Sequence, residues 1–297
     1  MNPIGVSTWV WTSPLTTEAF PRVAKHIAEL GFDLIEVPIE DPSDLDYGRA
    51  ASVVRDLGLG ASVCAAIGPD RDLIHKDADI RANAMGYIRH CIDAAHTLGA
   101  RHVVGPLYSA VGRTWQATAD ERKRDLDRLV AELRELAAYA DGHGVDLCVE
   151  PLNRFETSFI NLAEQAIEVV DRVDHPGCGI LLDTFHMNIE ERSVGAAIRG
   201  AGPRLRHLHA CENDRGAPGS GHVPWSEVAD ACRAISYDGA MVIESFTTTI
   251  QTIARAAAIW RPLAPTQDAL AMDGLRYLRA LRSQIVGAAG AKAIGSS

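Results

Sequence analysis

Short apolar runs rich in β-branched residues alternate along the chain with longer stretches of helical periodicity. The apolar runs predict strands at residues 4–10, 34–38, 61–66, 102–105, 146–150, 178–182, 205–209 and 240–244. Between them, apolar residues recur at i, i+3, i+4 and i+7, as in residues 18–30, 79–98, 120–140 and 162–173. Three of the helical stretches end in a Leu-Gly pair, where glycine is the expected left-handed cap.

Eight strands, each followed by a helix or a helix-sized segment, predict the α/β class with parallel strands and long right-handed crossovers. Eight such units favour a closed (βα)8 TIM barrel over an open sheet of six or seven strands. The barrel is expected over about residues 3–262, its last helix being residues 247–260. Residues 263–297 form an extension with one appended C-terminal helix, 267–286, and a frayed tail, 287–297. No linker divides the chain, so residues 1–297 are expected to form a single domain.

Composition and charge argue against nucleic acid and membranes as binding partners. Lys and Arg number 29 and Asp and Glu 39, a net charge of −10, which disfavours binding to the phosphates of nucleic acid. The longest uncharged stretch, residues 57–69, is broken by Gly and Pro and is far shorter than the roughly 20 residues of a membrane span.

The cysteines and the N-terminus favour a cytoplasmic protein. No basic segment followed by an apolar one opens the chain, so no export signal is expected. The six cysteines are widely spaced without a CxxC pair, and most lie in apolar runs, which is typical of buried, reduced thiols.

Ionisable residues fall where strands of a TIM barrel face the active site. Strand two offers Glu36, and four later strands end at or directly before Glu150, Asp183, His209 and Glu244. Carboxylates meeting at one barrel mouth repel one another, and a divalent cation removes that repulsion. Alternatively, each residue caps a helix or pairs with an arginine. Four together on consecutive strands favour the metal site.

Three oxygen ligands and one imidazole suit Mn²⁺, Mg²⁺, Co²⁺ or Fe²⁺, whereas sulfur ligands would select zinc. The role of Glu36 stays open between a hydrogen bond to a substrate and a local pair. The aromatic side chains Trp9 and Trp11 and the loop 107–109 either wall a sugar site or pack at the rim.

Loops after the strands carry further polar groups that can contact a polyhydroxylated ligand. Arg215 is a natural anchor for a substrate oxygen, because its forked donors bind two acceptors; its alternative is a surface pair with Asp214 or Glu212. His186 can instead orient a carboxylate that binds the metal. His207 is expected on the side of its strand opposite His209, as a packed or supporting histidine.

Four segments resemble the ketose 3-epimerases, the D-tagatose, D-allulose and L-ribulose 3-epimerase group of the xylose-isomerase-like barrels. They read VEPLNRFETSFIN (149–161), LLDTFHMNIEE (181–191), HLHACENDRGAPGSG (207–221) and VIESF (242–246). The resemblance extends over nearly the whole chain. It departs in strand three, where Ala66 stands at a position that is cysteine in some members, and this leaves the preferred sugar open.

The resemblance implies roles for particular residues. It places the ligands of one divalent cation, foremost Mn²⁺ with Co²⁺ or Mg²⁺ as alternatives, on Glu150, Asp183, His209 and Glu244. Two of these, Glu150 and Glu244, would also be the catalytic pair. Contacts to the sugar would come from Glu156, His186 and Arg215. A homodimer or homotetramer is implied as well.

The implied reaction is epimerisation at C3 of a free 2-ketose, a small-molecule sugar. A cation that chelates O2 and O3 would polarise the carbonyl and stabilise a cis-enediolate, while one glutamate takes the C3 proton and the other returns one on the opposite face. Alternatives are an aldose–ketose isomerase, an inosose-type dehydratase and a sugar-binding barrel without catalysis.

Overall fold

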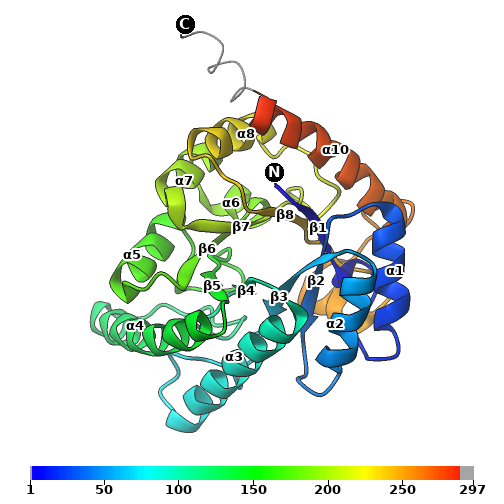
Figure 1. Cartoon of the computed structure of the whole chain (residues 1–297). Coiled ribbons are helices and arrows are strands. Elements are labelled where there is room, and N and C mark those ends of the chain that lie inside the picture. Colours follow the sequence, from blue (N-terminus) through cyan, green and yellow to red (C-terminus); the bar gives the residue numbers. More distant parts are fainter. Residues whose placement is uncertain (1, 288–297) are drawn as a thin grey trace, which may run out of the picture.

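The computed structural model describes residues 2–287, and eight parallel strands close there into a barrel in sequence order (Figure 1). The strands are β1 (Ile4–Ser7), β2 (Leu34–Ile39), β3 (Gly60–Ala65), β4 (His102–Gly105), β5 (Asp146–Val149), β6 (Cys178–Asp183), β7 (Leu205–His209) and β8 (Ala240–Ile243). The ring is completed by pairing of β1 with β8. The predicted TIM barrel is confirmed.

Helices surround the barrel (Figure 1). They are α1 (Phe20–Leu30), α2 (Tyr47–Asp56), α3 (Ala78–Leu98), α4 (Ala119–Gly142), α5 (Ala163–Val173), α6 (Thr184–Glu190), α7 (Val194–Ala201), α8 (Trp225–Ala234), α9 (Gln251–Ala256) and α10 (Gln267–Gly287). In α1, for example, Phe20, Val23, Ala24 and Ile27 are buried, the spacing of one helical face.

The appended C-terminal helix is confirmed as α10, which packs against α8 and against β1 and β8. It lies between α8 and α1 on the outer ring (Figure 1). The frayed tail expected from residue 287 lies outside the described residues beyond Gly287, the last residue of α10.

Two expected elements are shorter than predicted. The first strand ends at Ser7, and Thr8–Val10 form a 3-10 helix whose N-cap is the Ser7 side chain. The helix expected at residues 247–260 is reduced to α9. The Thr247 hydroxyl accepts from the backbone N–H of Thr249 at 3.2 Å, a local bond that competes with helix formation. After α9, Ala258 takes a left-handed φ of 53°, which a helix cannot continue through.

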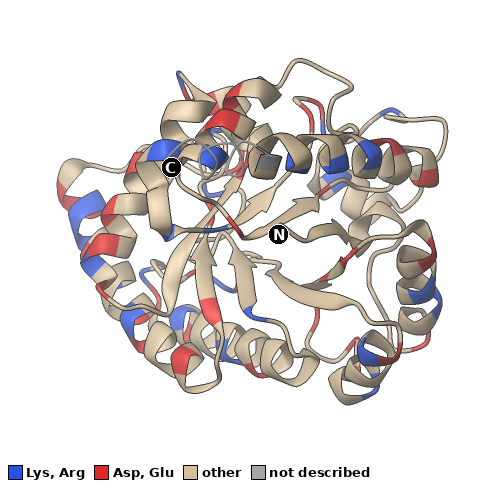
Figure 2. Cartoon of the chain, turned by 45° about the horizontal axis from the view of Figure 1, so that its top comes forward, with Lys and Arg blue, Asp and Glu red and all other residues tan. Residues whose placement is uncertain are grey.

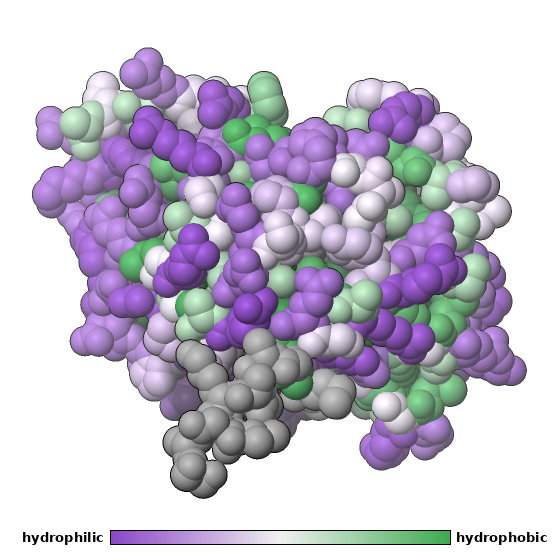
Figure 3. Space-filling view, turned by 90° about the horizontal axis from the view of Figure 1, so that it is seen from above, coloured by the Kyte–Doolittle hydropathy of each residue, from purple (hydrophilic) through white to green (hydrophobic). Residues whose placement is uncertain are grey.

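Charged side chains of both signs lie mainly on the outer helices, whereas the strands are mostly uncharged (Figure 2). On the face shown in Figure 3, hydrophilic residues predominate and hydrophobic ones are scattered among them. Among the described residues, no helix combines the length and the apolar character needed to cross a bilayer.

Gly105 closes β4 directly beside the mouth of the barrel. Its φ of 127° is a conformation that side chains disfavour, and an added Cβ would lie 3.0 Å from the carbonyl oxygen of Ala65. The Gly105 carbonyl accepts from the backbone N–H of Glu150 at 3.0 Å. The glycine therefore sets the backbone from which Glu150 projects.

We expect Gly105→Ala to lower the free energy of unfolding by about 1–3 kcal/mol, the usual range for forced backbone strain. The matched control is Gly86→Ala within α3, where an added Cβ meets nothing within 4 Å. That change should raise stability by roughly 0.5–1 kcal/mol, because alanine loses less backbone entropy in a helix. Urea unfolding measures the change in the free energy of unfolding for each variant. If both changes had the same sign, this account of Gly105 would be contradicted.

Candidate active site

Four ionisable side chains converge at the C-terminal ends of four consecutive strands. Asp183 and His209 are the last residues of β6 and β7, and Glu150 and Glu244 directly follow β5 and β8. All four are buried, and each offers one ligand atom within 4.8 Å of the others. The structure thus brings together the four residues expected to hold a cation, and we call them the cage.

The cage has the chemistry of a cation site. The buried atoms Glu150 Oε1 and His209 Nδ1 have no hydrogen-bond partner among the described residues. His209 Nδ1 lies 3.8 Å from Glu150 Oε1 and 3.5 Å from Glu244 Oε1. Buried polar atoms without partners are costly. Three carboxylates and one imidazole suit a divalent metal ion, so the residues present fit one.

Burial raises the pKa of Glu150 well above its ordinary value, and repulsion from Glu244 and Asp183 adds to this against the opposing charge of His209. Burial also acts to raise the pKa of Glu244. There, however, the positive charges of His209 and Arg215 outweigh burial and hold the pKa below its ordinary value. The two glutamates therefore differ in their affinity for a proton.

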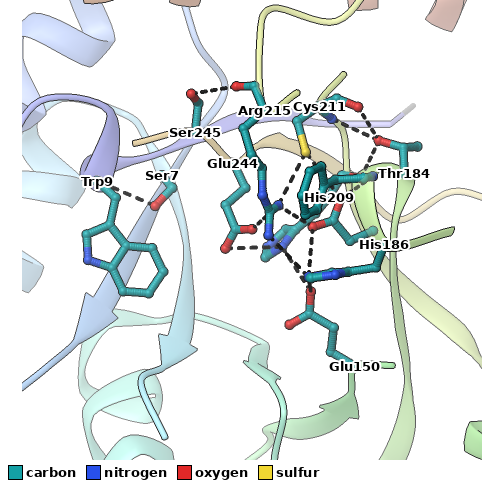
Figure 4. A network of polar contacts seen from close by, with 12 residues as sticks. Ser7, Trp9, Glu150, Thr184, His186, His209, Cys211, Arg215, Glu244 and Ser245 are labelled. Carbon is teal, nitrogen blue, oxygen red and sulfur yellow. Dashed lines mark hydrogen bonds and ion pairs between the residues drawn. The ribbon is translucent and has the colours of Figure 1, made fainter. Parts of the chain in front are cut away.

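Arg215 supplies positive charge to the cage. Its Nη1 donates to Asp183 Oδ2 at 2.5 Å and to Glu244 Oε2 at 2.7 Å, and the side chain extends between Glu244 and His186 (Figure 4). The guanidinium also lies over the ring of Phe185, 4.1 Å from its centre. The alternative of a surface pair is wrong, because Asp214 pairs instead with Arg261 at 2.8 Å.

A cavity of about 400 Å³ opens over the cage. Its lining includes Glu150, Glu156, His186, Arg215 and Glu244, and also Trp9, Glu40, Ile67, Arg71 and Phe246. A volume of this size suits a small molecule.

The cavity wall differs in part from expectation. Trp9 lines it and stacks against Phe246, but Trp11 donates its indole N–H to Asp268, away from the site. The loop residues Leu107, Tyr108 and Ser109 are buried in the packing and do not line the cavity. Two further lining residues, Glu40 and Arg71, were not predicted from the sequence. Glu40 directly follows β2, which ends one residue later than expected, and Arg71 lies in the loop after β3.

Comparison with known proteins shows the family of the chain. The family described as xylose isomerase-like TIM barrel matches residues 24–281. D-psicose 3-epimerase of Ruminiclostridium cellulolyticum is 36% identical over 252 residues, covering 84% of this chain and 86% of that protein. L-ribulose 3-epimerase of Mesorhizobium japonicum is 34% identical, covering 94% and 93%. The chain belongs to the ketose 3-epimerase family.

A solved structure of L-ribulose 3-epimerase superposes on this family member with a TM-score of 0.92 at 32% identity, covering 100% of both chains. The similarity therefore includes the barrel and the loops above it. As a member of the ketose 3-epimerase family, the protein is an enzyme of the isomerase class.

Asn153 organises two of the expected sugar contacts. Its backbone N–H and its side-chain amide each lie 3.0 Å from His186 Nδ1, and the amide also donates to Glu156 Oε1 at 2.8 Å. Burial lowers the pKa of His186 to about 3, so the ring is neutral. Nδ1 accepts from Asn153, and Nε2 lies 3.1 Å from Arg215 Nη2, on the side of the ring that faces the cage.

Glu36 and His207 lie together inside the barrel below the cage. His207 Nε2 is 3.1 Å from Glu36 Oε2, so Glu36 forms a local pair. The expectation that His207 points away from His209 is wrong, because residues two apart on a strand share a face. Both histidine rings contact Glu36.

Glu212 is a structural anchor of the loop that carries Arg215. It is fully buried, and its carboxylate accepts from Gly219 N at 2.8 Å, Val223 N at 3.1 Å and the Trp225 indole at 2.6 Å. Its backbone carbonyl accepts from Arg215 N at 3.0 Å. The loop thereby holds Arg215 at its left-handed φ of 68°.

We expect Glu212→Gln to lower the free energy of unfolding by about 1–3 kcal/mol, because an amide N–H would face backbone donors in a buried site. Asp214→Asn in the same loop is the control. Its surface pair with Arg261 contributes less than about 1 kcal/mol. Urea unfolding compares the two; an equal effect would show that Glu212 does not anchor the loop.

Proposed function

We propose that this protein catalyses the epimerisation of free 2-ketoses at C3, with Glu150 and Glu244 as the acid/base pair. The arrangement of the cage carries the proposal. Its two glutamates stand at the ends of a four-strand arc, with Asp183 and His209 between them. Two glutamates on separate strands of the arc are what a two-base reaction at C3 requires, one for each face of the carbon. The names of the similar proteins, D-psicose and L-ribulose 3-epimerase, support the same reaction.

The cage would hold one divalent cation through Glu150, Asp183, His209 and Glu244. The oxygen-rich donor set favours Mn²⁺, with Co²⁺ or Mg²⁺ as alternatives. A bound cation supplies Lewis-acid polarisation of the ketose carbonyl and offsets the negative charge that develops on its oxygens.

The protein's own residues move the proton. One glutamate oxygen takes the proton from C3, the C3–H electron pair moves into the C2–C3 bond, and the ketose becomes a cis-enediolate. The other glutamate, protonated beforehand, donates its proton to C3 from the opposite face. The pair ends with its protonation states exchanged, and the reverse epimerisation uses the opposite roles.

Glu156, His186 and Arg215 would bind the sugar near the reacting carbons. All three line the cavity beside the cage. Asn153 holds the His186 ring through Nδ1, and Nε2 of the same ring lies beside Arg215 Nη2 at the cavity wall. Arg215 contributes a forked donor, since it is no longer needed to neutralise Asp183 and Glu244 when a cation is present.

We expect Glu150→Gln and Glu244→Gln each to reduce epimerisation by at least about 10²–10⁴-fold, the usual contribution of a positioned acid or base. Turnover of free ketohexoses and ketopentoses is followed by NMR, together with exchange of the C3 proton in D₂O. Glu164→Gln, an exposed acid on α5, is the matched control and should leave the rate unchanged. Full activity in both active-site variants would refute the acid/base pair.

The same NMR spectra separate the competing reactions. An aldose product would indicate an aldose–ketose isomerase, and loss of a hydroxyl would indicate a dehydratase. Binding of the ketose without any product would indicate a sugar-binding barrel. A C3 epimer is the result that the proposal requires.

We expect exhaustive treatment with EDTA to abolish activity and added Mn²⁺ to restore it, because the cage carboxylates then lose and regain their cation. Parallel addition of Co²⁺ and Mg²⁺ ranks the metals. A chelated, metal-free enzyme that retained its rate would refute the metal dependence.

Three expectations from the sequence stay predictions. They are a homodimer or homotetramer, a cytoplasmic location, and a single domain over residues 1–297. Size-exclusion chromatography with light scattering measures the first directly.

A further inference from the structure

A second polar cluster lies inside the barrel below the cage. It consists of Glu36 on β2, Ser62 on β3, and His207 and His209 on β7, and each of these side chains is buried. Glu36 and Ser62 are direct partners in the β2–β3 register. Glu36 does not line the cavity above the cage, so it is out of reach of a substrate there. Burying a charged carboxylate is costly unless neighbouring groups stabilise it. Glu36 is therefore expected to serve the residues around it.

The two oxygens of Glu36 have different neighbours. Oε2 accepts from the Ser62 hydroxyl at 2.9 Å and faces His207 Nε2 at 3.1 Å. Two donors on one oxygen fix the plane of the carboxylate. Oε1 lies 3.0 Å from His209 Nε2, and neither of these two buried atoms has a hydrogen-bond partner among the described residues.

His209 is thereby placed between two negative groups. Its Nε2 faces Glu36, and its Nδ1 faces the cage, 3.5 Å from Glu244 Oε1. A neutral imidazole binds a metal through one nitrogen only while the other nitrogen carries the proton. A carboxylate at that other nitrogen favours this tautomer, fixes the ring and makes the ligand more basic.

We propose that Glu36 is a positioning residue for the cation, acting through His209, with Ser62 and His207 holding Glu36 in place. This inference rests on the proposed function, since it requires that the cage bind a divalent cation. It assigns the buried carboxylate of β2 to the metal centre, although Glu36 is not one of the four cage residues and does not line the sugar cavity.

The test is the affinity of the purified enzyme for Co²⁺, measured by competition with a chromophoric chelator and by the visible absorption of bound Co²⁺. Glu36→Gln preserves shape and should weaken Co²⁺ binding about 10–100-fold, the usual effect of losing such a partner. The visible spectrum should shift, because the imidazole ligand is altered. Glu36→Asp withdraws the carboxylate from His209 Nε2. Its affinity for Co²⁺ should lie between that of Glu36→Gln and that of the wild type.

Asp146→Asn is the matched control, a buried carboxylate at the start of β5 that pairs with Arg206 at 2.9 Å. It should leave Co²⁺ affinity and spectrum unchanged even if it lowers stability. Wild-type affinity and spectrum in Glu36→Gln would overturn the inference while leaving the proposed function intact. Absence of Co²⁺ binding by the wild-type enzyme would overturn both.

Ser62→Ala decides the case if Glu36→Gln does not fold. Removing the hydroxyl frees the Glu36 carboxylate to turn away from His209, so Co²⁺ binding should weaken several-fold with the spectrum shifted in the same direction. Unchanged affinity and spectrum in Ser62→Ala would then overturn the inference.

Discussion

Repulsion among buried carboxylates is the constraint on which this site depends. Glu150, Asp183 and Glu244 meet within 4.8 Å at the barrel mouth, where little water screens their charges. Two residues place positive charge next to these carboxylates: Arg215 from the loop after β7, and His209 at the end of β7. A divalent cation supplies more charge in less volume, and so the repulsion among these carboxylates would favour metal binding.

The barrel makes this crowding possible. Parallel strands that follow one another in sequence are neighbours in space, and all their C-terminal ends lie at one rim. One ligand from each of β5, β6, β7 and β8 therefore suffices to form the cage without any long-range coincidence. The loops after these strands then bring Arg215 and His186 over it, held by Glu212 and Asn153. The strands thus carry the four cage residues, and the loops carry the polar groups that line the cavity beside them.

The sequence predicts which residues lie at the C-terminal ends of the strands better than it predicts which lie deeper inside the barrel. The four cage residues could be predicted because each ends an apolar run that the sequence displays. Glu36 lies within its run, and only the structure shows that it does not line the cavity but is hydrogen-bonded to Ser62 and lies beside both histidines. Similarly, the helix expected after β8 looked continuous in its apolar spacing. Local hydroxyl bonds at Thr247 and a left-handed Ala258 shorten it in the folded chain.

The sequence by itself determined the order of the eight units, the appended helix and the four residues of the cage, because these follow from local periodicity and from the parallel topology. Tertiary structure decided which partner each polar side chain meets. Arg215 turns inward to two carboxylates, Glu212 turns into its own loop, and His207 and His209 share Glu36. Those choices depend on distances between residues far apart in the chain, which periodicity along one strand or helix does not contain.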